Sequence, residues 1–78
     1  MSVHEIALKK VMARVFEISE EQITPESSPD TLEQWDSLKH MELIVEIENY
    51  FQIELPEVAI IESLNFELVL LWIDRLKK

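Results

Sequence analysis

The residues best suited to chemistry lie in one tetrapeptide, Trp35-Asp36-Ser37-Leu38. It stands where a polar, proline-containing stretch gives way to a long helical pattern. Asp36 and Ser37 both suit a helix start, because their side-chain oxygens can accept a backbone N–H that the first turn leaves without a partner. A hydroxyl there lies at the positive end of the helix dipole, where a phosphate ester is electrostatically favoured. Taken alone, the motif is equally typical of an ordinary helix cap, so the choice between a cap and a modification site depends on the rest of the sequence.

Other reactive groups are scarce. The 78 residues include no cysteine and no glycine. This excludes a thiolate nucleophile, a Cys-based zinc site, a disulfide framework and a glycine-rich phosphate loop. His4 and His40 have no second ligand at metal-binding spacing, and we expect His4 to be a solvated first-turn residue. Nothing resembles a nucleophile–base pair, so the sequence predicts no catalytic residues, no metal site and no enzyme.

The charge is strongly acidic, with a formal net charge of −9. Lys39 is the only basic side chain between residues 15 and 74, a stretch that holds every acidic residue except Glu5. Such a field repels phosphate backbones, so nucleic acid is not an expected partner. It attracts partners with basic surfaces. The alternative is that these charges only keep the protein in solution, as on many acidic proteins.

The length indicates one small domain, residues 1–78. The N-terminal residues do not form a signal peptide. The longest apolar run, residues 68–73, is much too short to span a bilayer. We therefore expect a cytoplasmic monomer, although the apolar C-terminal segment leaves self-association open.

The first half of the chain predicts one helix and a long loop. Apolar residues at helical spacing, opened by a Ser2–Glu5 capping box, indicate a helix over about 3–16. A second Ser-x-x-Gln pattern, Ser19 to Gln22, predicts one short turn. Two prolines and several small polar residues then predict irregular structure to about residue 35. The residues expected to anchor these elements in a core are Val3, Ala7, Leu8, Val11, Met12, Val15, Phe16, Ile18, Ile23, Leu32 and Trp35.

A second helix is predicted over about 37–51. Met41, Ile44, Ile47 and Phe51 recur every three or four residues and should face the core. Leu38 and Val45 form another apolar row beside acidic residues. This row either extends the core or forms a contact strip for a partner, and the pattern alone does not choose between them.

The last third predicts an extended link and two more helices. Residues 52–55 are too few for a strand without a partner, and Pro56 suits the start of a short helix over 57–62, with Val58 and Ile61 pointing inward. Ser63 or Asn65 then caps a helix that ends near Leu76. Its core stripe is Phe66, Val69, Ile73 and Leu76, and its other apolar residues, Leu68, Leu70, Leu71 and Trp72, exceed what three neighbours can cover. The sequence thus predicts an all-α fold of four helices with a long first connection.

At this point the chain resembles the acyl carrier proteins, the small phosphopantetheine-bearing carriers of fatty-acid and polyketide synthesis. The resemblance covers essentially all 78 residues. It rests on Asp36-Ser37-Leu38 at the head of an acidic helix with Met41-Glu42-Leu43-Ile44, and on the run from Tyr50 to Pro56 that ends Ile-Glu-Leu-Pro.

The resemblance implies a right-handed four-helix bundle. It also implies that a phosphopantetheinyl transferase attaches 4'-phosphopantetheine, donated by coenzyme A, to Ser37, with Asp36 and Leu38 in the transferase recognition site. Glu42 and Glu48, with Leu38 and Val45, match the family's docking face for acyl-loading and acyl-processing enzymes with basic patches. The space between the second and third helices is expected to shelter an acyl chain.

This chain departs from the fatty-acid carriers around the serine. Trp35 precedes Asp36, and Lys39-His40 follows Leu38, a form closer to carriers of specialised or cell-envelope pathways. The resemblance leaves open an acyl carrier or a peptidyl or aminoacyl carrier. A helical interaction module, in which Ser37 is only a cap, is the third alternative and leaves the whole-chain match unexplained.

Overall fold

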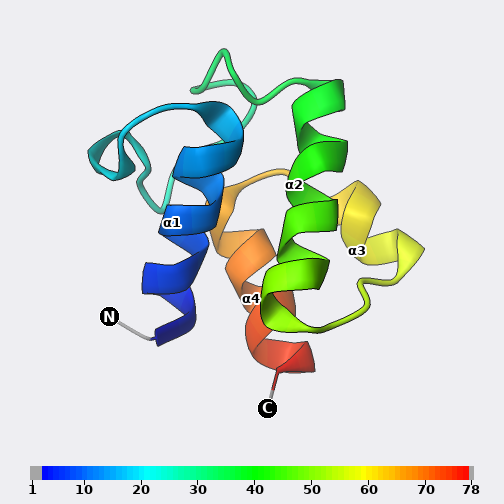
Figure 1. Ribbon diagram of the computed structural model, residues 1–78. Coiled ribbons are helices and arrows are strands. Elements are labelled where there is room, and N and C mark those ends of the chain that lie inside the picture. Colours follow the sequence, from blue (N-terminus) through cyan, green and yellow to red (C-terminus); the bar gives the residue numbers. More distant parts are fainter. Residues whose placement is uncertain (1–2, 78) are drawn as a thin grey trace.

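The computed structural model describes residues 3–77, so the predicted Ser2 cap lies outside the described residues. The described chain folds into four α-helices and one short 3₁₀ turn (Figure 1). These elements are α1 (Val3–Phe16), η1 (Glu20–Gln22), α2 (Ser37–Phe51), α3 (Glu57–Glu62) and α4 (Phe66–Leu76). All of them were predicted from the sequence.

Side-chain caps fix where two of the helices begin. The Asp36 carboxylate accepts the Lys39 backbone N–H at 2.8 Å, which starts α2 at Ser37. The Asn65 side chain accepts the Leu68 N–H at 2.8 Å, so Asn65, and not Ser63, caps α4. Each cap satisfies an N–H that would otherwise lack a partner in the first turn.

The helices form a bundle in which α1 runs opposite to α2 and α4 (Figure 1). The short α3 lies beside α2 and contacts α4, and the loop from α1 to α2 closes the upper end in that view. Ser37 therefore stands at the end of the bundle where this loop arrives.

One continuous apolar core joins the helices to the loop. Its buried side chains are Leu8, Val11, Met12, Val15, Phe16, Ile23, Leu32, Trp35, Leu43, Ile44, Ile47, Phe51, Leu55, Ala59, Phe66, Val69 and Ile73. The loop contributes Ile23, Leu32 and Trp35 to it, as predicted. The Trp35 ring packs on Phe16, with ring centroids 5.4 Å apart. The loop is thus part of the packed interior and holds the start of α2 in place.

Several residues predicted for the core lie at the surface instead. Met41 is 50% exposed, and Leu43, on a neighbouring face of α2, takes the interior position. In α3 the buried residue is Ala59, while Val58 and Ile61 point outward. Val3 and Leu76, near the ends of α1 and α4, are also exposed.

His4 lies in the first turn of α1, as predicted, but it is only partly solvated, with 28% of its side chain exposed, and it has a partner. Its Nδ1 lies 2.6 Å from a carboxylate oxygen of Asp74, so it joins α1 to α4. Its ring also meets the edge of Phe51, at a centroid distance of 5.9 Å.

Candidate functional site

Ser37 is the first residue of α2 and is exposed. Asp36 directly before it uses its carboxylate for the Lys39 N–H and its carbonyl for the His40 N–H, at 2.8 Å each. These bonds fix the backbone on both sides of the serine while its side chain stays at the surface. The arrangement presents one hydroxyl, on rigid backbone, at the positive end of a helix dipole.

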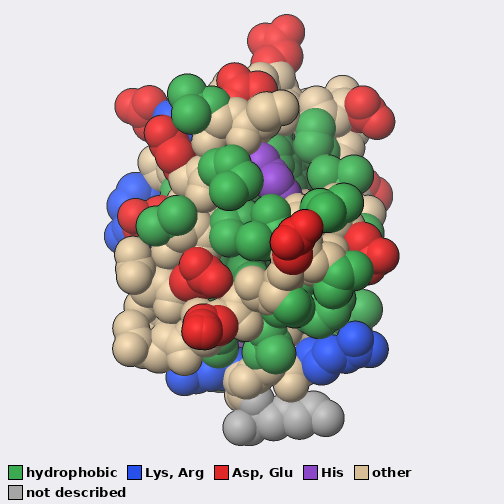
Figure 2. All heavy atoms as spheres, turned by 90° about the vertical axis from the view of Figure 1, so that its right-hand side faces the viewer, with side chains coloured by type: hydrophobic (Ala, Val, Ile, Leu, Met, Phe, Trp, Pro, Cys, Tyr) green, Lys and Arg blue, Asp and Glu red, His purple; other side chains and the backbone are tan. Residues whose placement is uncertain are grey.

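An open hollow of about 660 Å³ lies on one side of Ser37, between the α1–α2 loop, α2 and α3. We call it the Ser37 hollow. Figure 2 shows this face of the molecule, where hydrophobic side chains gather around a visible histidine and acidic side chains lie between them. The hollow is lined by Pro29, Asp30, Trp35, Asp36, Ser37, His40, Met41, Ile60, Ile61 and Leu64. A flexible group attached to Ser37 would begin at the edge of a largely apolar depression.

His40 connects three parts of the structure beside this hollow. The Trp35 indole N–H donates to His40 Nδ1 at 3.0 Å, and His40 Nε2 lies 2.8 Å from the carbonyl oxygen of Ile60 in α3. A carbonyl oxygen can only accept, so Nε2 carries the ring proton and Nδ1 is the acceptor. The Trp35 and His40 rings also stack, with centroids 6.1 Å apart. His40 therefore has a defined structural role, joining the loop and α2 to α3.

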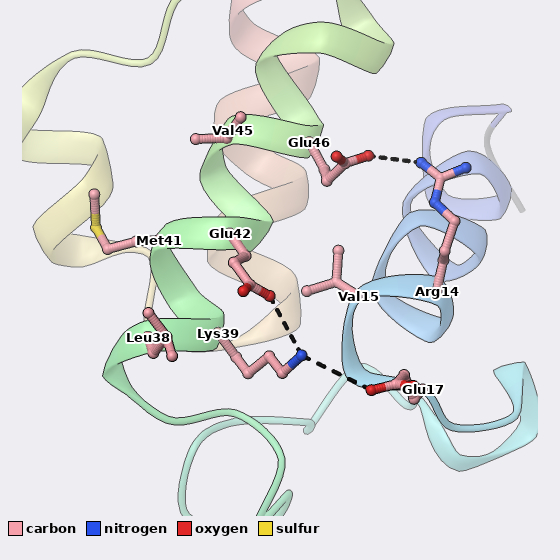
Figure 3. Close-up of a pocket in the computed structure, with 9 residues that line it drawn as sticks. All are labelled: Arg14, Val15, Glu17, Leu38, Lys39, Met41, Glu42, Val45 and Glu46. Carbon is pink, nitrogen blue, oxygen red and sulfur yellow. Dashed lines mark hydrogen bonds and ion pairs between the residues drawn. The ribbon is translucent and has the colours of Figure 1, made fainter.

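A groove of about 640 Å³ lies between α1 and α2 (Figure 3). Its apolar residues are Val15, Leu38, Met41 and Val45. Ion pairs border it: Arg14 bonds Glu46 at 2.8 Å, and Lys39 lies 3.3 Å from Glu42 and 4.0 Å from Glu17. The two basic side chains of this groove thus neutralise acidic side chains on the surface of α2.

The predicted docking residues of α2 occupy different environments. Leu38 and Val45 are 70% and 51% exposed, so the apolar row that they form does not extend the core. Glu42 lines the groove with them. Glu48 is half-buried, and its carboxylate accepts the Leu55 backbone N–H at 2.9 Å. The structure therefore brings Leu38, Glu42 and Val45 together, and it engages Glu48 with the link to α3.

The sequence predicts Trp35 as a core residue, but it did not reveal the hydrogen bonds that join Trp35 to His40 and His40 to α3. Trp35 and His40, five positions apart around a helix start, were a usable signal for a loop-to-helix contact. No sequence pattern reveals the Ile60 carbonyl, because every residue has one and only the packing of α3 selects it.

Two further properties bear on the type of site. Among residues 3–77, no cluster of three or more His, Asp or Glu side chains is arranged to hold a metal ion. In the same part of the chain, no helix is both long and apolar enough to cross a bilayer.

Residues 7–70 match the family model described as the phosphopantetheine attachment site. This is most of the chain, so the protein belongs to that family of carrier domains. No curated protein matches it. Among solved structures, it is similar to the solution structure of the holo acyl carrier protein from Geobacter metallireducens, with 27% identity and a TM-score of 0.84. That similarity covers 95% of this chain and 85% of the other. The chain is thus an acyl-carrier-family protein, with the predicted all-α fold.

This membership defines the cofactor and the type of activity. The family carries covalently attached 4'-phosphopantetheine, and such domains are carriers and not enzymes. When bound, the group supplies a thiol on a flexible arm, which holds a cargo as a thioester. The residues at the head of α2 fit it, because an exposed hydroxyl stands at a helix N-terminus beside an open hollow.

Proposed function

We propose that this protein carries acyl intermediates as thioesters on a 4'-phosphopantetheine arm attached to Ser37. We assign it to fatty-acid, polyketide, specialised-metabolite or cell-envelope biosynthesis. The observation that carries the proposal is the placement of Ser37, exposed as the first residue of α2 and at the edge of the Ser37 hollow. Tethering supports transfer chemistry, because it raises the effective concentration of the cargo at each enzyme that docks.

Other serines fit the attachment less well. Ser27 and Ser63 are 2% and 1% exposed, which keeps their hydroxyls from a transferase. The Ser28 hydroxyl accepts the Asp30 N–H at 3.2 Å in a loop, and Ser19 precedes the three-residue η1 turn. Only Ser37 combines exposure with the start of a long helix among the described residues.

The attachment is a phosphoryl transfer from coenzyme A. A phosphopantetheinyl transferase would join the Ser37 oxygen to the phosphorus of the phosphopantetheine part and break the bond between the two phosphates. Adenosine bisphosphate leaves, and the hydroxyl proton passes to a base on the transferase. Asp36 holds the helix start through its cap, and exposed Leu38 offers an apolar contact to the same enzyme.

Docking of the later enzymes is proposed to use the α2 face. Leu38 and Val45 supply exposed apolar area, and Glu42 supplies an exposed carboxylate. Glu48 adds negative charge to this face, although one of its carboxylate oxygens accepts the Leu55 N–H. The overall negative field favours partners with basic docking patches. Such charge-guided complexes are weak and sensitive to salt, so the carrier can move quickly from one enzyme to the next.

The test is to incubate the protein with coenzyme A and a broad-specificity transferase, and then to weigh the intact protein. We expect a mass gain of one phosphopantetheine for the parent chain and none for Ser37→Ala. Ser19→Ala is the matched control, because it removes another exposed hydroxyl at the start of a helical turn, and it should be modified like the parent. An unmodified parent chain, or a Ser37→Ala variant that still gains the mass, would show that the assignment is wrong.

A further inference from the structure

We infer that the cargo of this carrier stays outside the helical bundle, because the Trp35–His40–Ile60 hydrogen bonds close the boundary between α2 and α3 against it. The cargo class that follows is short or polar acyl groups, not long saturated chains. The inference rests on the proposed attachment at Ser37, since that residue places the arm at this boundary.

The bonds lie across the path that a chain from Ser37 would take inward. His40 is one helical turn after Ser37, lines the same hollow and reaches the Ile60 carbonyl of α3 at 2.8 Å. Behind it, the Trp35 indole is 1% exposed and donates to the same imidazole ring at 3.0 Å. A chain entering between α2 and α3 at this level has to separate His40 from Ile60 or displace the indole.

Opening this boundary is unfavourable for a saturated chain. Such a chain has no donor or acceptor to replace the broken hydrogen bonds. The indole N–H, the imidazole and the carbonyl would then lose their partners in a partly or fully buried place, and buried polar groups without partners are costly. Farther inward, Leu43, Ile47 and Ala59 are completely buried in the core, so the chain would also have to displace packed side chains.

The Ser37 hollow offers the cargo a place outside this boundary. Its rim includes the exposed apolar side chains of Met41, Ile61 and Leu64, together with Asp30 and Asp36. A short group can rest against these residues and remain accessible to enzymes. A long saturated chain would leave most of its methylenes in water, which is unfavourable in proportion to their apolar area.

A chain-length series on the parent protein tests the inference. The transferase would load acetyl-, hexanoyl- and decanoyl-pantetheine arms, each verified by mass. We expect the three forms to melt within about 1 °C of one another, which is a small stability difference for a domain of this size. The amide NMR signals of Leu43, Ile47 and Ala59 should coincide, and hydroxylamine should cleave the three thioesters at the same rate. A melting temperature that rises with chain length, with shifted signals from these core residues, would overturn the inference.

Variants test the part assigned to His40. His40→Ala removes both hydrogen bonds and should let the decanoyl form melt above the acetyl form. Val58→Ala is the matched control, because it removes an exposed apolar side chain of α3 that does not line the hollow and makes neither of those bonds, and it should behave like the parent. A folded His40→Ala protein that shows no chain-length dependence would contradict the role of His40, and the parent series decides the cargo question even where this variant does not fold.

The outcomes separate this inference from the proposed function. A parent chain that gains no phosphopantetheine fails as a carrier at Ser37. A loaded chain whose core responds to decanoyl remains a carrier at Ser37, but one that shelters long cargo inside.

Discussion

At the scale of single residues, two buried serines form a natural comparison. Ser27 and Ser63 are 2% and 1% exposed. The Ser27 hydroxyl accepts the Thr24 backbone N–H at 2.8 Å, whereas the Ser63 hydroxyl has no hydrogen-bond partner among the described residues. The Ser27 hydroxyl should therefore stabilise the fold and the Ser63 hydroxyl should not, because a buried hydroxyl is favourable only where it is hydrogen-bonded.

This contrast predicts opposite effects of the same substitution. Ser27→Ala leaves the Thr24 N–H without its acceptor, and we expect the free energy of unfolding to fall by about 1–2 kcal/mol. Ser63→Ala removes only an unbonded hydroxyl, so the free energy of unfolding should stay level or rise by up to about 1 kcal/mol. Urea unfolding of the parent and both variants measures this. Equal losses of unfolding free energy in the two variants would contradict the prediction, because they would mean that the Ser63 hydroxyl stabilises the fold as much as the bonded Ser27 hydroxyl does.

The histidines show where inference from the sequence ends at this scale. The sequence shows no second metal ligand beside His4 or His40, but it does not show their hydrogen-bond partners. One partner of His40, Trp35, lies five residues away, whereas Asp74 for His4 and the Ile60 carbonyl for His40 are 70 and 20 residues away, and only the folded packing brings them near. The cap at Asp36 was predictable, because its partner N–H lies three residues away on the same helix.

At the scale of elements, the ends of α1 and α2 are made without glycine. Glu17, directly after α1, and Gln52, directly after α2, have positive φ angles of 56° and 57°. Gln52 is fully left-handed, with ψ 50°, and its N–H donates to the Glu48 carbonyl. Glycine is the usual residue at such a position, since a Cβ atom disfavours this conformation.

Gln52→Gly should therefore stabilise the protein by about 0.5–1 kcal/mol, through relief of the left-handed strain. It also loses the bond from the Gln52 side chain to the Asn49 carbonyl. Gln52→Ala controls for that loss, because it removes the same side-chain bond and keeps the Cβ atom, and it should be less stable than the parent. The measurement is thermal unfolding of the three proteins. A glycine variant no more stable than the alanine variant would contradict the prediction.

Helix bounds were predictable from the sequence because caps, prolines and apolar periodicity are local signals. Which side of a helix faces inward was less so. In α2 the predicted stripe began at Met41, but Leu43 is buried and Met41 is half exposed. In α3, four of the six residues are apolar and they lie on both faces, so only contact with the neighbouring helices decides that Ala59 is inside. The exposed row of Leu38 and Val45 was recognised, but the choice between core and surface required the fold.

At the scale of the whole molecule, the charge distribution opposes the compact state. The formal net charge is −9, and the acidic side chains at the surface include Glu20, Glu21, Glu26, Asp30, Glu33, Glu54, Glu57, Glu62 and Glu67. Pairs such as Arg14–Glu46 and Lys39–Glu42 relieve part of this repulsion around the groove between α1 and α2. Like charges held close together lower stability, and dissolved ions screen them.

We therefore expect added salt or divalent cations to raise the melting temperature. Moving from about 10 mM to 0.5 M salt shortens the Debye length from about 30 Å to below 8 Å, which screens neighbours on this surface. We expect the melting temperature to rise by about 2–5 °C. In a domain of this size, such a rise corresponds to an increase of about 0.5–1 kcal/mol in the free energy of unfolding. Calorimetry across a salt series measures it.

Charge variants distinguish screening from a general salt effect. Glu54→Gln with Glu62→Gln removes two exposed charges, so the double variant should melt higher than the parent in low salt and respond less to added salt. Lys9→Gln with Lys10→Gln is the matched opposite, because it makes the net charge more negative and should steepen the response. If all three proteins respond equally, or if salt lowers their melting temperatures, the acidic surface is too well dispersed for self-repulsion to limit the stability of this carrier.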